Sequence, residues 1–206
     1  MKYNSKNYDY EGRFNSYYHQ IKNIFDIMPE NGSLLEIGPG SGFLNKYLQG
    51  ADIILETLDI TRETKPTYIG EITDIPSKDL NYDCVVAFEV LEHLPFDLFE
   101  KGIREMMRVS KKYVLFSVPD VRWYISMEFR APTNSHGFRK VISLPRLRHR
   151  KIENTRGNDY HYWEIGRKGY PLKKILEVIE RVDIKLIKHY RISYNPTHHI
   201  FVLCKD

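Results

Sequence analysis

The sequence contains little cysteine and no long apolar run. Only two of its 206 residues are cysteines, Cys84 and Cys204, and both lie within short apolar stretches. Two cysteines do not make a disulfide framework, so we expect both to be buried apolar side chains in a reduced, cytoplasmic protein. No apolar run approaches the roughly 18–20 residues that a membrane-spanning helix needs. The polar, tyrosine-rich start "MKYNSKNYDYEGR" argues against a secretory signal.

A strong excess of one charge is also missing. The chain has 31 basic and 27 acidic side chains and a net charge of +4, a mild bias that suits an anionic partner without indicating nucleic acid. Hydrophobic residues make up 42% and charged residues 28% of the chain, which is ordinary for a globular protein. We expect one domain over 1–206, with an N-terminal helical cap at 1–30 and a substrate-side insert at 119–160.

Short apolar runs alternate with amphipathic stretches along most of the chain, and this alternation predicts a doubly wound, mostly parallel α/β sheet. Two strands follow one another at the end, with Asn195 and Pro196 predicted as the turn between them, so we expect one antiparallel strand. The expected helices are 14–28, 41–50, 96–109 and 171–182, and the expected strands are 33–38, 52–60, 66–72, 83–90, 112–119, 184–194 and 199–205.

The stretch from 119 to 160 shows no clear period and is predicted to be irregular. So long an irregular insert in a compact domain is more often functional than structural. The segment 138–151, "FRKVISLPRLRHRK", contains basic side chains and no acid, which favours recognition of an anionic acceptor such as a phosphorylated sugar, a phosphorylated lipid or an RNA end; a solvated loop is the alternative. The basic residues are Arg139, Lys140, Arg146, Arg148, Arg150 and Lys151.

The stretch "LLEIGPGSGFL" follows a predicted strand and places glycine at every second position, at Gly38, Gly40 and Gly42. In an open parallel sheet, such a turn lets a ligand approach the backbone and leaves N–H groups free at the start of the next helix. A turn that only packs a strand against a helix is the alternative. Asp59 ends the next strand about twenty residues later, where a carboxylate can accept hydrogen bonds from ribose hydroxyls. Together these features predict a cofactor that carries adenosine.

The residues around the glycines argue against a dinucleotide. A dinucleotide site uses the spacing G-x-G-x-x-G and directs a helix N-terminus at a pyrophosphate. Here the spacing is G-P-G-S-G, and Glu36 precedes it. A carboxylate this close would repel a pyrophosphate and would suit a ligand with a cationic head.

The chain resembles the class I S-adenosylmethionine-dependent methyltransferases, and among them the type 11 set of small-molecule methyltransferases. The resemblance lies in "LLEIGPGSGFL", "LDI", "GEITDIP", "FEVLEHLP", "VLFSVP" and "HYWEIG", and it covers about residues 30–205. It implies a Rossmann-like seven-stranded sheet, mostly parallel, whose C-terminal hairpin adds an antiparallel strand. It also implies S-adenosylmethionine as the cofactor.

The resemblance assigns cofactor contacts residue by residue. The glycine turn and Glu36 would surround the methionine portion, Asp59 would bind the ribose, and Ile60 would flank the adenine. Glu71 stands where the family usually has an aspartate for the adenine amino group, and Asp74 is the fallback. The full predicted cofactor set is Arg13, Glu36, Gly38, Gly40, Gly42, Asp59, Ile60, Glu71, Ile72, Phe88 and Glu89.

The catalytic residues are harder to predict, because a methyl group on a sulfonium is already activated and the enzyme chiefly has to align a nucleophile and exclude water. His93 and His161 are the candidates for a general base or an acceptor contact. Some relatives, including ubiquinone-pathway O-methyltransferases and small-RNA 2′-O-methyltransferases, hold Mg²⁺ or Mn²⁺ on such residues. That set would be Glu89, Glu92, His93 and His161 here, and we expect no metal.

The sequence therefore predicts an enzyme that moves a methyl group from S-adenosylmethionine to an O, N or C atom of a small acceptor, with a phosphorylated or acidic acceptor favoured by the basic insert. One alternative is a catalytically silent methyltransferase-like protein that binds RNA or another anionic partner. The other alternative is a nicotinamide-dependent oxidoreductase.

Overall fold

A seven-stranded sheet forms the centre of the computed structural model, which describes residues 10–129, 138–144 and 161–205. The strand order is β3-β2-β1-β4-β5-β9-β8; β9 runs antiparallel to both of its neighbours, β5 and β8, and the other pairs are parallel. The predicted fold class is thereby confirmed. The strands are β1 Gly32–Ile37, β2 Ile53–Asp59, β3 Tyr68–Ile69, β4 Tyr82–Phe88, β5 Ser110–Pro119, β8 Lys185–Ile192 and β9 Asn195–Cys204.

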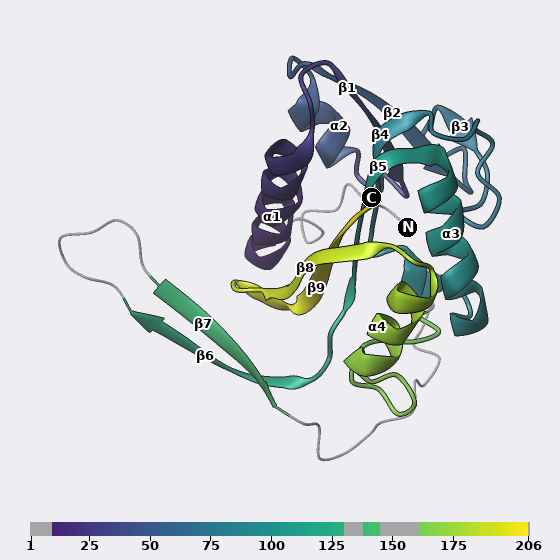
Figure 1. Ribbon diagram of the computed structural model, residues 1–206. Coiled ribbons are helices and arrows are strands. Elements are labelled where there is room, and N and C mark those ends of the chain that lie inside the picture. The colour runs from purple at the N-terminus through teal and green to yellow at the C-terminus, as the bar shows by residue number, and fades with distance from the viewer. Residues whose placement is uncertain (1–9, 130–137, 145–160, 206) are drawn as a thin grey trace.

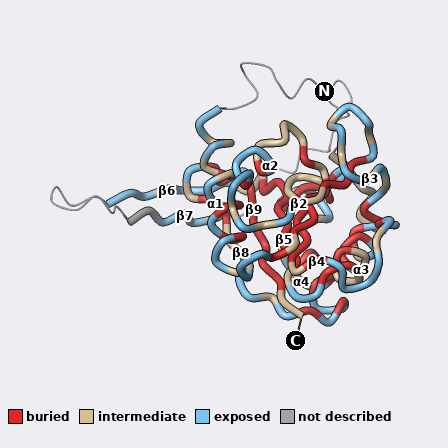
Figure 2. The backbone as a smooth tube through the Cα atoms, turned by 90° about the horizontal axis from the view of Figure 1, so that it is seen from above, coloured by how far each residue is buried: buried red, intermediate tan, exposed pale blue. Residues whose placement is uncertain are grey.

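Helices cover both faces of the sheet (Figure 1). One face packs against α1 and α2, and the other packs against α3 and α4. Figure 2 shows the consequence, with the buried residues gathered along the central strands and between them and the helices. The helical elements are α1 Glu11–Ile27, α2 Phe43–Leu48, η1 Leu91–His93, η2 Phe96–Leu98, α3 Phe99–Val109 and α4 Leu172–Arg181.

The apolar spacing of the chain explains these elements. In α3, Phe99, Ile103 and Met106 recur at helical spacing and are fully buried against the sheet. In β4, by contrast, nearly every residue is buried, because helices cover this central strand on both sides. Among the described helices, none is long and apolar enough to cross a membrane.

The strand order reverses between β1 and β4, and the turns after these two strands touch one another. A Cβ atom built on Gly38 would lie 2.6 Å from Cγ2 of Val90, which follows β4. In open α/β sheets, ligands bind in the crevice beyond the carboxyl ends of the strands at such a switch point. Because β9 is antiparallel, its beginning, and not its end, lies at this same edge of the sheet.

Three details of the sequence prediction are wrong. The expected strand 66–72 shrinks to two residues, Tyr68 and Ile69, and the expected helix 96–109 begins as the short 3-10 turn η2. The predicted turn at Asn195 and Pro196 lies instead at 193–194, because Ile192 pairs with Asn195 and both Asn195 and Pro196 belong to β9. Asn195 uses its side-chain amide to donate to the buried Ser16 Oγ, at 2.9 Å.

The insert 119–160 is also not irregular throughout. It contains an antiparallel two-stranded ribbon, β6 Trp123–Phe129 paired with β7 Phe138–Leu144, which projects from the body of the protein (Figures 1 and 2). The prediction missed it even though Trp123, Ile125, Met127 and Phe129 alternate along β6, because Lys140 and Val141 interrupt the same pattern in β7. The basic residues Arg146, Arg148, Arg150 and Lys151 lie outside the described residues. The division of the chain into one domain, a cap and an insert stays a prediction.

Candidate functional site

The glycine turn after β1 needs glycine for its backbone conformation. Gly38, Gly40 and Gly42 have φ angles of 68°, 53° and 70°, a region that other residues rarely adopt. Gly42 is the N-cap of α2, and a Cβ atom added there would meet nothing within 4 Å. Packing therefore restricts Gly38, where Val90 is close, whereas at Gly42 only the backbone angle requires glycine and the space in front is open.

Glu36 lies on β1, just before this turn, and is nearly inaccessible to solvent. Among the described residues, its Oε2 atom has no hydrogen-bond partner. Burial raises the pKa of the Glu36 carboxyl from 4.5 to about 8, because an isolated charge in an apolar interior is unfavourable. A buried carboxylate that lacks a counter-charge is a site that a cationic or hydrogen-bond-donating ligand would complete.

Asp59 ends β2 and is largely buried. Its Oδ1 accepts a hydrogen bond from the Thr61 N–H at 3.0 Å, and its Oδ2 accepts one from the Thr64 hydroxyl at 2.9 Å. Each carboxylate oxygen has a second lone pair, so the side chain keeps capacity for further donors. Ile60, the predicted adenine neighbour, is largely exposed beside it.

The residues predicted for the adenine edge follow β3 in a tight turn. Glu71 and Asp74 face each other in an isolated β-bridge, and the Asp74 N–H donates to the Glu71 carbonyl at 3.0 Å. Ile72 is buried, whereas Glu71 and Asp74 are exposed. Both carboxylates are therefore accessible to a ligand, so Asp74 is not limited to capping the turn.

Glu89 follows β4 with a φ angle of 56°, which is unusual for a residue with a side chain. Its backbone N–H donates to the Ser117 carbonyl at 3.0 Å, and its Oε1 accepts from the Ser117 hydroxyl at 2.8 Å. The chain is thus forced into a strained turn at the end of the central strand, and such strain is typical of functional sites. Phe88 is half-buried one residue before, and Arg13 lies on α1 with its guanidinium 5.8 Å from the Tyr10 ring centroid.

His198 is a residue that the sequence analysis missed. It lies near the start of β9, opposite Pro119, and its Nδ1 is 3.6 Å from Oε1 of Glu89 and 3.2 Å from Oγ of Ser16. The antiparallel course of the last strand brings this ring to the edge where the parallel strands end. The sequence signal was the pair "HH" near the start of the expected final strand.

A second cluster gathers on the other side of β4. The side chains of Glu92, His93 and His161 each place one potential ligand atom within 4.8 Å of the others. The rings of His93 and His161 are 4.9 Å apart in an edge-to-face arrangement, and Nε2 of His161 lies 4.0 Å from Oε1 of the fully buried Glu92. Three of the four residues of the predicted metal set therefore meet, while Glu89 contacts Ser117 and His198 instead.

Glu164 completes the surroundings of His161 and was also missed. Its Oε1 is 2.9 Å from Nδ1 of His161, and its Oε2 accepts from the guanidinium of Arg167. Burial alone would raise the pKa of the Glu164 carboxyl, but the hydrogen bonds from His161 and Arg167 outweigh it and lower the pKa. Glu164 thus stays ionised and fixes the orientation of the His161 ring. Its spacing in "HYWE", three residues after the histidine, was the available signal.

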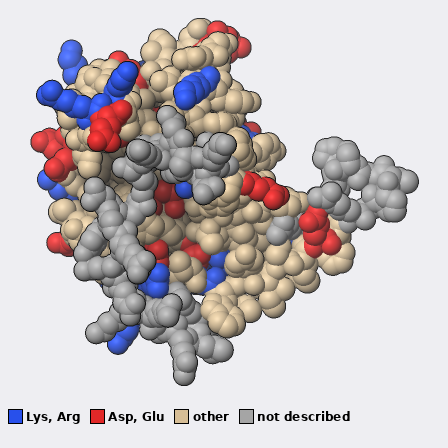
Figure 3. Space-filling model, turned by 180° about the vertical axis from the view of Figure 1, so that it is seen from behind, with Lys and Arg blue, Asp and Glu red and all other residues tan. Residues whose placement is uncertain are grey.

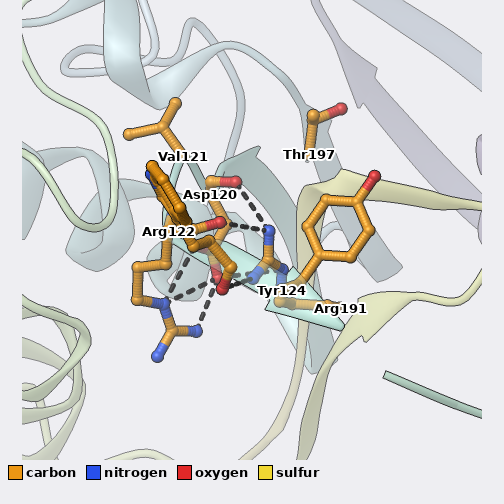
Figure 4. Close-up of a pocket in the computed structure, with 7 residues that line it drawn as sticks. Asp120, Val121, Arg122, Tyr124, Arg191 and Thr197 are labelled. Atoms are coloured by element: carbon orange, nitrogen blue, oxygen red, sulfur yellow. Dashed lines mark hydrogen bonds and ion pairs between the residues drawn. The ribbon is translucent and has the colours of Figure 1, made fainter. Parts of the chain in front are cut away.

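The end of β5 carries a buried ionic cluster centred on Asp120. Its carboxylate binds the Arg122 guanidinium at 2.6 Å and lies 3.5 Å from Nε of Arg191 (Figure 4). It also binds Nδ1 of His199 at 3.0 Å. Burial would raise the pKa of Asp120, but the hydrogen bonds from His199 and Arg122 and the nearby cationic charges outweigh it, so the pKa is about 2. The carboxylate therefore remains charged at every physiological pH.

A cleft of about 420 Å³ adjoins this cluster at the base of the ribbon. None of the residues predicted for the cofactor, for catalysis or for a metal lines it. The cleft lies two strands away from the glycine turn, beyond β4, so it is separate from the crevice at the switch point. Its lining residues are Asp120, Val121, Arg122, Trp123, Tyr124, Arg191 and Thr197.

Comparisons with solved structures give the same fold. A protein from Pyrococcus horikoshii is 11% identical with a TM-score of 0.61, and covers 100% of this chain and 94% of its own. An S-adenosylmethionine-dependent methyltransferase from Clostridium acetobutylicum is 10% identical with a TM-score of 0.61, at 95% and 92% coverage. A Haloferax volcanii methyltransferase solved with its Trm112 activator is 12% identical with a TM-score of 0.59, at 94% and 92% coverage.

A comparison with curated protein sequences finds no match. The family model described as "Methyltransferase domain" matches residues 10–167, which is more than half of the chain and includes the glycine turn, the strained turn after β4 and the cluster around His161. The resemblance to class I methyltransferases is thereby confirmed for family and fold, and the finer type 11 subgroup stays a prediction. The chain belongs to the methyltransferase domain family.

Proposed function

We propose that this enzyme transfers the methyl group of S-adenosylmethionine to a small acceptor. The observation that carries the proposal is Glu36, a buried carboxylate whose Oε2 has no partner among the described residues, next to an open glycine turn at the topological switch point. The methionine end of this cofactor carries an ammonium and a sulfonium, which would supply the missing positive charge. A nicotinamide dinucleotide would instead bring a pyrophosphate, which the same carboxylate would repel.

The rest of the predicted cofactor set fits this placement. Gly38, Gly40 and Gly42 keep the backbone open beside Glu36, and Asp59 lies at the end of the neighbouring strand with spare acceptor capacity for a ribose. Glu71 and Asp74 offer two accessible carboxylates for the adenine amino group. Ile60 would flank the adenine, and the backbone of Ile72 would face its edge. Arg13, Phe88 and Glu89 would border the methionine end. When bound, the cofactor supplies the electrophilic methyl group.

The acceptor side is formed by His161, His93 and Glu92. Glu164 holds Nδ1 of His161, and Nε2 lies 4.0 Å from Oε1 of Glu92; this nitrogen would accept the proton of a hydroxyl or amine that attacks the methyl group. His93, packed edge-to-face on this ring, restricts its rotation. His198, bound by Glu89 and Ser16 on the opposite side of β4, is in place to contact the acceptor from the α1 side.

The alternative function of the same cluster is to bind a divalent cation. One carboxylate and two imidazoles within 4.8 Å are a donor set that a transition-metal ion accepts. The two alternatives predict different effects of a metal chelator on methyl transfer. Methyl transfer that EDTA leaves unchanged supports His161 as proton acceptor, whereas loss on chelation with recovery on adding Mn²⁺ supports the metal.

The described surface gives little support to a nucleic-acid-binding role without catalysis. Acidic and basic side chains are interspersed on the face seen in Figure 3, so this view shows no extended field of one sign outside the grey residues. The preference for an acidic or phosphorylated acceptor rests on the basic residues after β7, which lie outside the described part of the chain.

Calorimetry with S-adenosylhomocysteine tests the proposal. We expect binding by the native protein and a loss of about 1–3 kcal/mol for Asp59→Ala, the magnitude of a lost hydrogen bond to a charged group. Asp52→Ala is the matched control, because Asp52 is an exposed aspartate just before the same strand. Binding of NAD with no binding of S-adenosylhomocysteine would contradict the proposal. Once binding of S-adenosylhomocysteine is shown, transfer of labelled methyl from S-adenosylmethionine to an extract of small molecules would identify the acceptor.

A further inference from the structure

The ribbon β6–β7 has one polar face, and that face is attached to the body of the protein. The Arg191 guanidinium donates to the Ser143 hydroxyl at 3.0 Å and lies 5.0 Å from the Tyr124 ring centroid. Farther out, the Tyr194 hydroxyl donates to Glu128 at 3.2 Å. Tyr124, Ser143 and Glu128 share one face of the ribbon, since they alternate in strand register.

The base of the ribbon is held rigidly. Arg191 also donates to the backbone carbonyls of Asp120 and Arg122, each at 3.1 Å, and its side chain is almost fully buried (Figure 4). A buried guanidinium that satisfies several carbonyls fixes the direction in which β6 leaves the sheet. The ribbon is therefore a fixed projection with a defined orientation.

The opposite face of the ribbon is apolar and open to solvent. We call it the apolar ribbon face. Its exposed members range from 38% for Met127 to 63% for Phe129, and in Figure 3 the described part of the projection is mostly tan, the colour of uncharged residues. Cross-strand register places Leu144 opposite Trp123 and Ile142 opposite Ile125. The face consists of Trp123, Ile125, Met127, Phe129, Ile142 and Leu144, and the exposed Lys140, which pairs with Met127, is the charged side chain on the same side of the ribbon.

Physical chemistry disfavours leaving this face bare. A two-stranded ribbon is marginally stable in water on its own, and three or more strands with a covered apolar face are needed for independent stability. The exposed side chains of the face amount to roughly 500 Å², as large as the largest apolar patches on ordinary monomers, which are often functional. Both edges of the ribbon, moreover, carry backbone groups with no strand partner among the described residues.

We propose that the apolar ribbon face binds the same face of a second copy of this chain. Two such faces together would bury about 1,000 Å², which reaches the size that a specific protein interface needs. A two-fold contact covers both faces at once and closes without leaving a free surface, and it brings the strand count of the combined unit to four. The face runs for about 20 Å away from the sheet, which is too long for a small acceptor bound beyond β4 to cover.

Light scattering coupled to size exclusion tests the proposal. We expect native protein at micromolar concentration to have twice the mass of the 24.5 kDa chain. The double variant Ile125→Glu with Phe129→Glu should be monomeric, with association weakened at least a hundredfold. The control for added charge is Ile54→Glu, which introduces one glutamate at a 65% exposed isoleucine on β2 and should stay dimeric. A monomeric native protein, or a dimeric double variant, overturns the proposal.

A second measurement keeps the test independent of folding defects. Met127→Cys, near the middle of the face and placed in a Cys204→Ser background, should form a covalent dimer on mild oxidation, whereas Ile54→Cys in the same background should not. Equal or absent crosslinking in both variants overturns the proposal. So does a monomeric native protein that co-sediments with phosphatidylcholine–phosphatidylglycerol vesicles through this face, which would assign the face to a lipid surface. Neither readout depends on methyl transfer.

Discussion

The surroundings of Glu36 and those of His161 are both built at the carboxyl edge of one sheet, but from very different lengths of chain. The first region, which we call the cofactor half, is the continuous segment 32–60, which holds the glycine turn, Glu36, Asp59 and Ile60; the other predicted cofactor contacts, such as Arg13 and Glu71, come from outside it. The second, the acceptor half, combines residues 89–93, 117–123, 161–165 and 195–199. A site made from one continuous segment can be recognised by its motif, whereas a site made from four segments exists only once the sheet has assembled.

The two halves also treat charge differently. In the cofactor half, Glu36 is buried without a partner among the described residues, and its pKa is raised to about 8. In the acceptor half, Asp120 and Glu164 are buried with cationic or imidazole partners, and their pKa values are lowered. Glu36 can therefore take its counter-charge from a ligand. Asp120 and Glu164 already have their counter-charges and hold the neighbouring side chains in place. Four experiments test this difference.

The largest expected effect is the loss of the ionic cluster. Asp120→Asn removes the counter-charge of Arg122 and of the almost fully buried Arg191, which should lower the free energy of unfolding by about 3–5 kcal/mol in urea at pH 7. Because the pKa of Asp120 is depressed in the folded state, this contribution is complete above about pH 4 and is lost as the pH falls through about 2.

Asp26→Asn is the matched control for that variant. Asp26 pairs with Lys22 on the exposed side of α1, so its loss should cost at most about 1 kcal/mol. Similar unfolding curves for the two variants would mean that the cluster at the end of β5 does not stabilise the acceptor half.

The second effect separates chemistry from cofactor binding. His161→Gln should lower turnover of the acceptor about 100-fold while leaving the affinity for S-adenosylhomocysteine unchanged. His189→Gln is the comparison, because His189 is a histidine of β8 that contacts His199 and lies away from β4. Labelled methyl transfer and calorimetry measure the two quantities. A parallel loss of affinity and turnover would show that the two halves are not separable.

The third effect is a pH dependence of cofactor binding. The pKa of Glu36 is raised in the folded state, so its contribution to stability is present below about pH 4.5 and is lost as the pH rises toward about 8. The ammonium of the ligand favours the ionised form of Glu36, and affinity for S-adenosylhomocysteine should therefore rise about tenfold from pH 6.5 to 7.5. Calorimetry on Glu36→Gln should show no such rise. An identical rise in the variant would assign the titration to another group.

The smallest effect compares two glycines. Gly42→Ala and Gly50→Ala each place a Cβ on a backbone with positive φ, at 70° and 91°, and neither Cβ would meet an atom within 4 Å. Both should lose about 1 kcal/mol of stability from the backbone alone. Only Gly42→Ala should also weaken cofactor binding, because only Gly42 belongs to the turn beside Glu36. Equal affinities would place the cofactor elsewhere.

Sequence periodicity was sufficient for the main sheet and for the cofactor half. The glycine turn, Glu36 and Asp59 carry their signals within short segments, and covered strands such as β4 are recognisable as apolar runs. The ribbon β6–β7 was not recognised, because its apolar face meets solvent and because residues 130–137 separate its strands in place of the two-residue turn that marks a short hairpin.

The missed residues of the acceptor half share a cause. His198 approaches Glu89 only because β9 inserts antiparallel beside β5, a pairing of residues far apart in the chain. Glu164 is near His161 in sequence, yet its role depends on the segment 161–165 lying along η1, where the Tyr162 N–H donates to the Glu92 carbonyl at 2.8 Å. Such contacts follow from topology, which periodicity does not specify.

The position of β9 has a consequence for how the protein is made. This strand lies between β5 and β8 in the sheet, yet it follows both of them in the chain and so leaves the ribosome after them. A nascent chain halted before residue 195 would already carry the glycine turn, while β8 would lack a ladder partner and β5 would expose an open edge. Closure of the sheet is thus a late, long-range step. Chaperones and proteases would act on chains whose first strands are already paired while β5 and β8 still lack β9.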